Sequence, residues 1–148
     1  MTTTATRPES TTTPVSSGAA TAYSILMDFV LLGILALAAM AGQFLKADGQ
    51  RDAYGSYIDA HGLISEVSEA LVFAAAVVAI VKFRHLKTFA VGTPVLLVAM
   101  LFNGYLGGEI RDHGKDSYTI VHVPLAIAIT MGAAWLVTRG IALRKGRV

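Results

Sequence analysis

The sequence predicts an all-α integral membrane protein, a bundle of four transmembrane helices joined by short loops. Hydrophobic residues make up 54% of its 148 residues and charged residues only 15%, whereas a soluble domain carries about a quarter charged residues. The chain also contains four apolar stretches of about 20 residues, the length with which a helix crosses about 30 Å of hydrocarbon. Helices are expected because lipid offers no partner to unpaired backbone groups.

The chain divides into two tails and one membrane domain. Thr, Ser and Pro dominate residues 1–22, and such a segment buries too little apolar surface to fold, so we expect a disordered cytoplasmic tail. The bundle covers residues 23–140, and residues 141–148 are expected to form a basic cytoplasmic tail. The predicted spans, in chain order, are residues 23–45, 61–82, 88–108 and 118–138.

The basic residues predict the orientation of these spans. Lys82, Arg84 and Lys87 lie between the second and third spans, and four more basic residues follow the fourth, whereas acidic residues balance the basic ones in the other two connections. Loops with excess Lys and Arg stay in the cytoplasm. We therefore expect a multi-pass protein of the cell membrane with both termini cytoplasmic and the lipid bilayer around it. A net charge of +2 does not indicate a nucleic-acid partner.

Polar residues of the spans gather near the predicted outer face, although such residues are costly in a membrane. They are Gln43, His61, Ser65, Glu66, Ser68, Glu69, Asn103, Glu109 and His122. The predicted inner halves are almost free of polar side chains, with Asp28 as the exception. The outer half is therefore where we expect a functional site.

Two of the four histidines open membrane spans that run in the same direction, so His61 and His122 reach a similar depth. Two neutral imidazoles on facing helices can bind a haem iron from both sides, and the alternative is that both are ordinary interfacial residues. His85 and His113 lie in predicted loops, where we expect them to be solvated. The chain has no cysteine, so redox chemistry requires a bound cofactor. The candidate partners for haem propionates are Lys46, Arg51, Arg111 and Lys115.

The sequence around these two histidines resembles one four-helix half of haem A synthase. The resemblance lies in Asp59-Ala60-His61-Gly62 and in Val121-His122-Val123-Pro124-Leu125-Ala126. In each half of that family, histidines of the second and fourth helices face one haem. The chain is also similar to small actinobacterial-type four-helix membrane proteins of unknown function. The resemblance implies a haem bound by His61 and His122. We expect it to be a haem b, with Arg51 and Arg111 among its propionate partners.

The sequence departs from the synthase pattern in three ways. The family usually has a glutamate a few residues before the helix-two histidine, and here the nearest acid is Asp59. Gly62 stands where the family tends to have arginine, and the second half is absent. The resemblance therefore implies haem ligation without synthase activity. A homodimer could rebuild an eight-helix arrangement.

The leading hypothesis is a b-type membrane cytochrome that transfers electrons or handles haem, with quinol or a respiratory-chain protein as candidate partner. One alternative is a proton- or solute-coupled transporter that uses Glu66 and Glu69. The other is a non-catalytic anchor or assembly subunit of a respiratory complex. The sequence assigns no catalytic residue.

Overall fold

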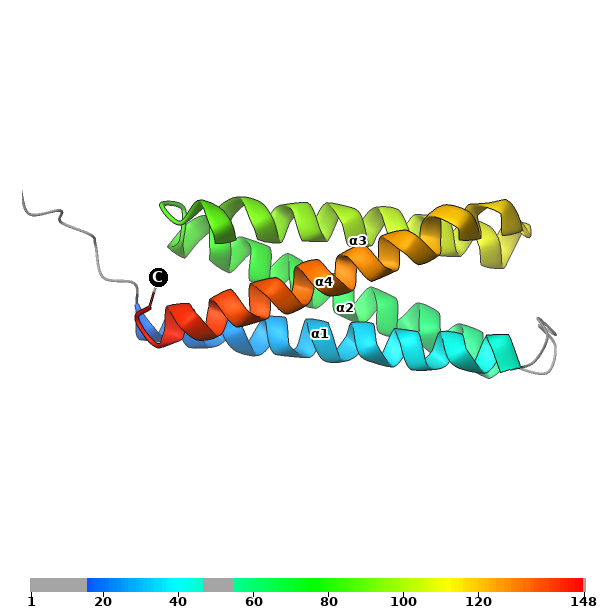
Figure 1. Ribbon diagram of the computed structural model, residues 1–148, viewed down its shortest axis with the longest axis horizontal. Coiled ribbons are helices and arrows are strands. Elements are labelled where there is room, and N and C mark those ends of the chain that lie inside the picture. The colour runs from blue at the N-terminus through cyan, green and yellow to red at the C-terminus, as the bar shows by residue number, and fades with distance from the viewer. Residues whose placement is uncertain (1–15, 47–54, 148) are drawn as a thin grey trace, which may run out of the picture.

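Four long α-helices and one short 3-10 helix make up the described part of the chain, residues 16–46 and 55–147 of the computed structural model. They are α1 (Ser17–Lys46), α2 (Gly55–Lys82), α3 (Lys87–His113), η1 (Asp116–Tyr118) and α4 (Thr119–Arg144). Figure 1 shows the four long helices extending side by side. Each of them is long and apolar enough to cross a membrane. The predicted all-α class and the four spans of membrane-crossing length are confirmed.

The helices pack in chain order. Each long helix packs closely against the next one, and α1 also packs against α4, whereas the backbones of the diagonal pairs α1/α3 and α2/α4 stay further apart within the described ranges. In Figure 1, α4 runs obliquely, next to α3 where η1 lies and next to α1 at the opposite end. We call these ends the η1 end and the α2–α3 loop end, the latter containing residues 83–86. The contact between α3 and α4 is the least extensive of the four long-helix pairs.

The helices extend beyond the predicted spans: α2 begins at Gly55, α3 ends at His113, and α1 and α4 continue into the predicted tails. α1 begins at Ser17, so residues 17–22 are helical and do not belong to a tail. Ala20 is only 2% exposed, and alanine is the best helix former, which explains the earlier start. α4 continues to Arg144 because Leu143 still packs into the core, so the basic tail is shorter than predicted. Residues 1–15 lie outside the described part of the chain.

An aromatic cluster closes the core at the α2–α3 loop end. The buried rings of Tyr23, Phe83 and Phe89 meet edge to face, with centroids 5.2–5.7 Å apart, which is the favoured geometry for aromatic pairs. The hydroxyls of Tyr23 and Thr93 form a buried hydrogen bond of 2.8 Å. The polar groups of this pair are thus satisfied within the protein.

Near the middle of α1, Gly33 allows close contact with α2. A Cβ at Gly33 would overlap Ser68 Oγ and lie 3.3 Å from Ser68 Cβ. Ser68 is buried and donates a 2.7 Å hydrogen bond to the Ile64 carbonyl. The short serine side chain leaves little room for adjustment.

We expect Gly33→Ala to lower the stability of the folded protein by about 1–3 kcal/mol, because overpacking forces the two helices apart. The measurement is reversible unfolding in mixed micelles, followed by circular dichroism. Gly42→Ala is the matched control on the same helix, since a Cβ at Gly42 meets nothing within 4 Å. Its expected effect is neutral or a gain of up to about 1 kcal/mol from helix propensity. Equal losses in both variants would contradict the proposed contact.

Candidate functional site

His122 is held by a hydrogen bond to the neighbouring helix. Its Nδ1 lies 3.1 Å from the backbone carbonyl oxygen of Asn103, so α4 and α3 together orient the half-buried ring. A carbonyl only accepts, so Nδ1 is the protonated nitrogen and donates. In the neutral ring, Nε2 then keeps its lone pair. Metal-binding histidines are oriented in this way, with the second nitrogen donating to a carbonyl or carboxylate.

Two glycines of α3 make room for side chains from the other helices. A Cβ at Gly107 would lie 3.2 Å from Cε1 and 3.7 Å from Nδ1 of His122. A Cβ at Gly104 would overlap Oε1 of Glu69, which extends from α2. We call Gly104 and Gly107 the glycine face of α3. His122 and Glu69 therefore pack against the same side of α3, one turn apart.

His61 lies at the same end, on α2. Its half-buried imidazole lies against the backbone of Leu37 on α1 and near enough to His122 for the two rings to repel each other when both are charged. One turn further along α2, Ser65 Oγ donates a 3.2 Å hydrogen bond to Oε1 of Glu69. The two predicted ligands thus lie at the same end of the bundle, on the diagonally opposite helices α2 and α4.

The predicted basic residues have different surroundings. The Arg111 guanidinium donates to both carboxylate oxygens of Asp112, at 2.7 and 3.1 Å. A Cβ at Gly62 would lie 2.8 Å from Nη1 of Arg111, the nitrogen that does not bond Asp112. Arg111 therefore reaches over α2 beside His61. Arg51 lies outside the described residues, as does the side chain of Lys46. Of the predicted cofactor-binding residues, the structure therefore brings His61, His122 and Arg111 to one end.

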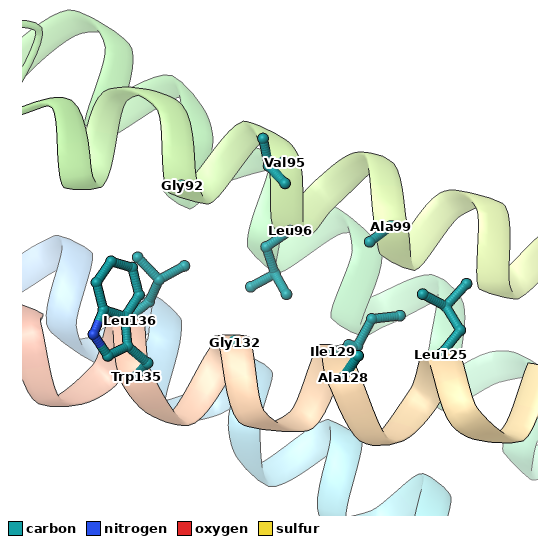
Figure 2. Close-up of a pocket in the computed structure, with 10 residues that line it drawn as sticks. All are labelled: Gly92, Val95, Leu96, Ala99, Leu125, Ala128, Ile129, Gly132, Trp135 and Leu136. Carbon is teal, nitrogen blue, oxygen red and sulfur yellow. The ribbon is translucent and has the colours of Figure 1, made fainter.

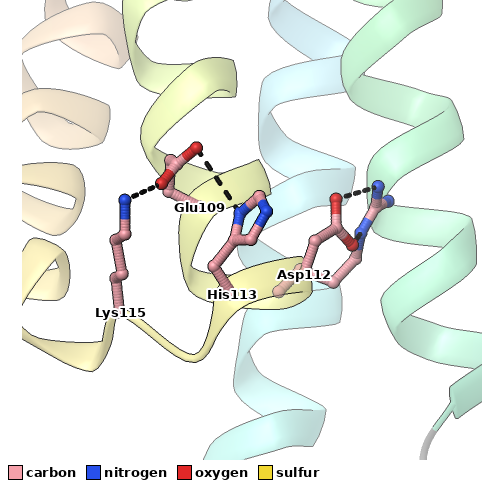
Figure 3. A network of polar contacts seen from close by, with 5 residues as sticks. Glu109, Asp112, His113 and Lys115 are labelled. Atoms are coloured by element: carbon pink, nitrogen blue, oxygen red, sulfur yellow. Dashed lines mark hydrogen bonds and ion pairs between the residues drawn. The ribbon is translucent and has the colours of Figure 1, made fainter.

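A second polar network lies at the turn between α3 and η1 (Figure 3). Lys115 Nζ hydrogen-bonds Oε2 of Glu109, and His113 Nδ1 lies 3.5 Å from Oε1 of the same carboxylate. The hydrogen bond that Lys115 donates to the Glu109 carboxylate raises the pKa of Lys115 above its ordinary value. Lys115 is therefore already paired, which weakens its candidacy as a propionate partner. His113 and His85 are both exposed, as expected of solvated residues.

Sequence reasoning missed the features of α3 that support His122. The sequence marks Asn103 only as a polar residue of the span, whereas it is the backbone carbonyl of Asn103 that contacts the imidazole. The run Asn103-Gly104-Tyr105-Leu106-Gly107-Gly108 is unusually rich in glycine for a helix. Glycine costs a helix about 1 kcal/mol relative to alanine, so such a run is a signal of close packing.

The described residues include no group of three or more His, Cys, Asp or Glu side chains that could hold a metal ion. A haem differs because its porphyrin supplies most of the ligands and the protein adds only axial ones. No protein-family model, curated protein or solved structure matches the chain. The resemblance to one half of haem A synthase therefore stays a prediction from the residues around His61 and His122.

Proposed function

We propose that this chain is a small b-type membrane cytochrome that binds one haem b through His61 and His122. The observation that carries the proposal is the 3.1 Å hydrogen bond from His122 Nδ1 to the Asn103 carbonyl. It fixes the ring and leaves Nε2 as a metal ligand. His61 is the natural second ligand because it lies at the same end of the bundle as His122, on the diagonally opposite helix.

The residues around the two histidines suit a haem. The glycine face of α3 carries no side chains of its own, so His122 lies directly against the α3 backbone. Arg111 is the candidate partner for a propionate, because guanidinium groups bind carboxylates strongly and Arg111 reaches over Gly62 next to His61. The haem would supply one-electron chemistry, and the protein would orient it and tune its potential.

The proposal includes an orientation in the cell membrane. Lys82, Arg84 and Lys87 lie at the α2–α3 loop end, and Arg144 ends α4 at that same end (Figure 1). The positive-inside rule places this end in the cytoplasm. The η1 end and the proposed haem site would then lie near the outer face, with both termini inside.

The structure gives less support to a transporter that uses Glu66 and Glu69. Glu69 is half-buried and accepts from Ser65, but Glu66 is exposed. Beyond Ser68, the side of α2 that faces the core carries Val72, Ala75 and Ala79, all fully buried. A proton or solute would find no polar partner along this part of α2. The cytochrome is therefore the better supported of the two functions.

The direct test is the absorption spectrum of the purified protein. Cells supplied with haem precursor should yield a coloured protein with about one haem per chain, as expected of a single pair of axial histidines. Its Soret band should sharpen and shift when dithionite reduces the oxidised sample. A colourless preparation of the folded protein, verified by circular dichroism, would refute the proposal.

A further inference from the structure

Glu69 is the charged residue of α2 that lies furthest into the bundle from the η1 end. The next charged residue of α2 is Lys82, about 20 Å further along the helix by helical rise. Glu66, one turn before Glu69, is exposed, whereas Glu69 is half-buried. Ionisable residues inside a membrane span are costly and usually functional, so the position of Glu69 calls for a role.

The carboxyl group of Glu69 is held between α2 and α3. Ser65 Oγ donates a 3.2 Å hydrogen bond to Oε1. A Cβ at Gly104 would overlap Oε1 and would lie 3.5 Å from Cδ and 3.9 Å from Oε2, so the whole carboxyl group packs against the α3 backbone. Glu66 is near enough to repel Glu69 when both are charged. The fold thus keeps a carboxyl group in a place where its negative charge is poorly supported.

This carboxyl group also lies close to both proposed haem ligands. Glu69 and His122 pack against the glycine face of α3, one turn apart. Along α2, Glu69 is two turns from His61, with Ser65 between them. Side chains of a helix point toward its N-terminus, so Glu69 extends from α2 toward the η1 end. A change of charge on a group bound by the two histidines would therefore act on Glu69.

We propose that Glu69 is the proton acceptor that accompanies reduction of the haem, taking up one proton when the iron gains one electron. The inference rests on the proposed function, because the iron is the group whose charge changes. The electron comes from a one-electron donor, which is dithionite in the test below. The proton comes from the outer aqueous phase and converts the Glu69 carboxylate into a carboxylic acid. The negative charge that enters the site is thereby balanced within it.

The helices around Glu69 offer no better acceptor among the described residues. The ionisable groups toward this end are His61 and Glu66 on α2, Tyr105, Glu109 and Arg111 on α3, and His122 on α4. Glu66, Tyr105 and Arg111 are exposed, and Glu109 is already bound by Lys115. α1 carries no charged residue between Asp28 and Lys46. The groove between α3 and α4 is lined by apolar side chains and glycines, none of which binds a proton (Figure 2).

The test is the midpoint potential of the haem as a function of pH, measured by dithionite titration of the protein in nanodiscs. Charges about 10 Å apart in a protein change a proton affinity about tenfold, and we expect this effect from haem reduction. The midpoint potential should therefore fall by about 59 mV in total as the pH rises through the titration of Glu69, because a carboxylate favours ferric iron. Glu69→Gln should stay at the potential that the unaltered protein has at low pH.

Glu66→Gln is the matched control, because it removes an exposed carboxylate one turn away on the same helix. It should keep the fall in potential. Glutamine at position 69 retains an oxygen that can accept from Ser65, so the fold is preserved. The haem propionates also titrate, but they do so in all three proteins. The difference between the curves therefore measures the contribution of Glu69.

Infrared difference spectra, reduced minus oxidised, give a second readout that does not depend on the potential. A carboxylic acid C=O band should appear on reduction in the unaltered protein and in Glu66→Gln, and it should be missing in Glu69→Gln. Identical potential curves for the unaltered protein and Glu69→Gln would overturn the inference and leave the cytochrome standing. So would the lack of that band in the unaltered protein. A colourless protein would overturn the proposed function and this inference with it.

Discussion

Alanine at either His61 or His122 is expected to abolish the bis-histidine haem spectrum, whereas alanine at His85 or His113 is expected to leave it intact. The first two side chains are half-buried at the η1 end, and the other two are exposed. Losing a group that only hydrogen-bonds a metal ligand costs about 10–100-fold in metal affinity. Losing an axial ligand itself should therefore lower the haem content at least as much. The measurements are haem per chain and the reduced-minus-oxidised spectrum of all four variants.

A methionine at His61 provides a sharper test of direct ligation. Replacing one histidine ligand by methionine raises the reduction potential of a haem. We therefore expect His61→Met to retain haem with an altered spectrum and a higher midpoint potential. A histidine that served only in packing would change the stability without moving the potential. If His85→Ala lost haem as completely as His122→Ala, the assignment of the ligands would be wrong.

The four spans could be predicted because the membrane imposes a simple requirement. A helix must cover about 30 Å of hydrocarbon with apolar residues, and these stretches are visible in the sequence. The ends of the helices could not be predicted in the same way. Residues 17–22 and 141–144 are helical because they pack on neighbouring helices, as Ala20 and Leu143 show. The orientation depends on the distribution of Lys and Arg and stays a prediction.

The shared end of His61 and His122 could also be predicted, because alternate helices of a chain with short connections run in the same direction. The pairing of His122 with the Asn103 carbonyl could not, since it depends on how α3 and α4 are rotated about their axes. The position of Arg111 over Gly62 could not be predicted either, because it depends on the contact between α2 and α3. Haem ligation itself stays a prediction.

A leucine at Gly107 is the second change from which we expect a large effect. The Cβ alone would lie 3.2 Å from Cε1 of His122, and the three further carbons of leucine would have to enter the space of the imidazole. The ring must then move, and its hydrogen bond to the Asn103 carbonyl, one turn back on the same helix, would be lost. We expect about 10–100-fold weaker haem binding, the usual cost of losing an orienting partner. Titration of the apoprotein with haemin measures this directly.

Gly108→Leu is the control that makes the result specific, because it places the same side chain on the next residue of the same helix. A Cβ at Gly108 meets nothing within 4 Å, and both substitutions gain the same helix propensity. A general effect of bulk or helicity would therefore appear in both variants. A selective loss in Gly107→Leu would show that haem binding depends on the position of the His122 ring. Equal haem affinity in the two variants would mean that α3 does not orient His122 for ligation, and the proposed site would lose its principal support.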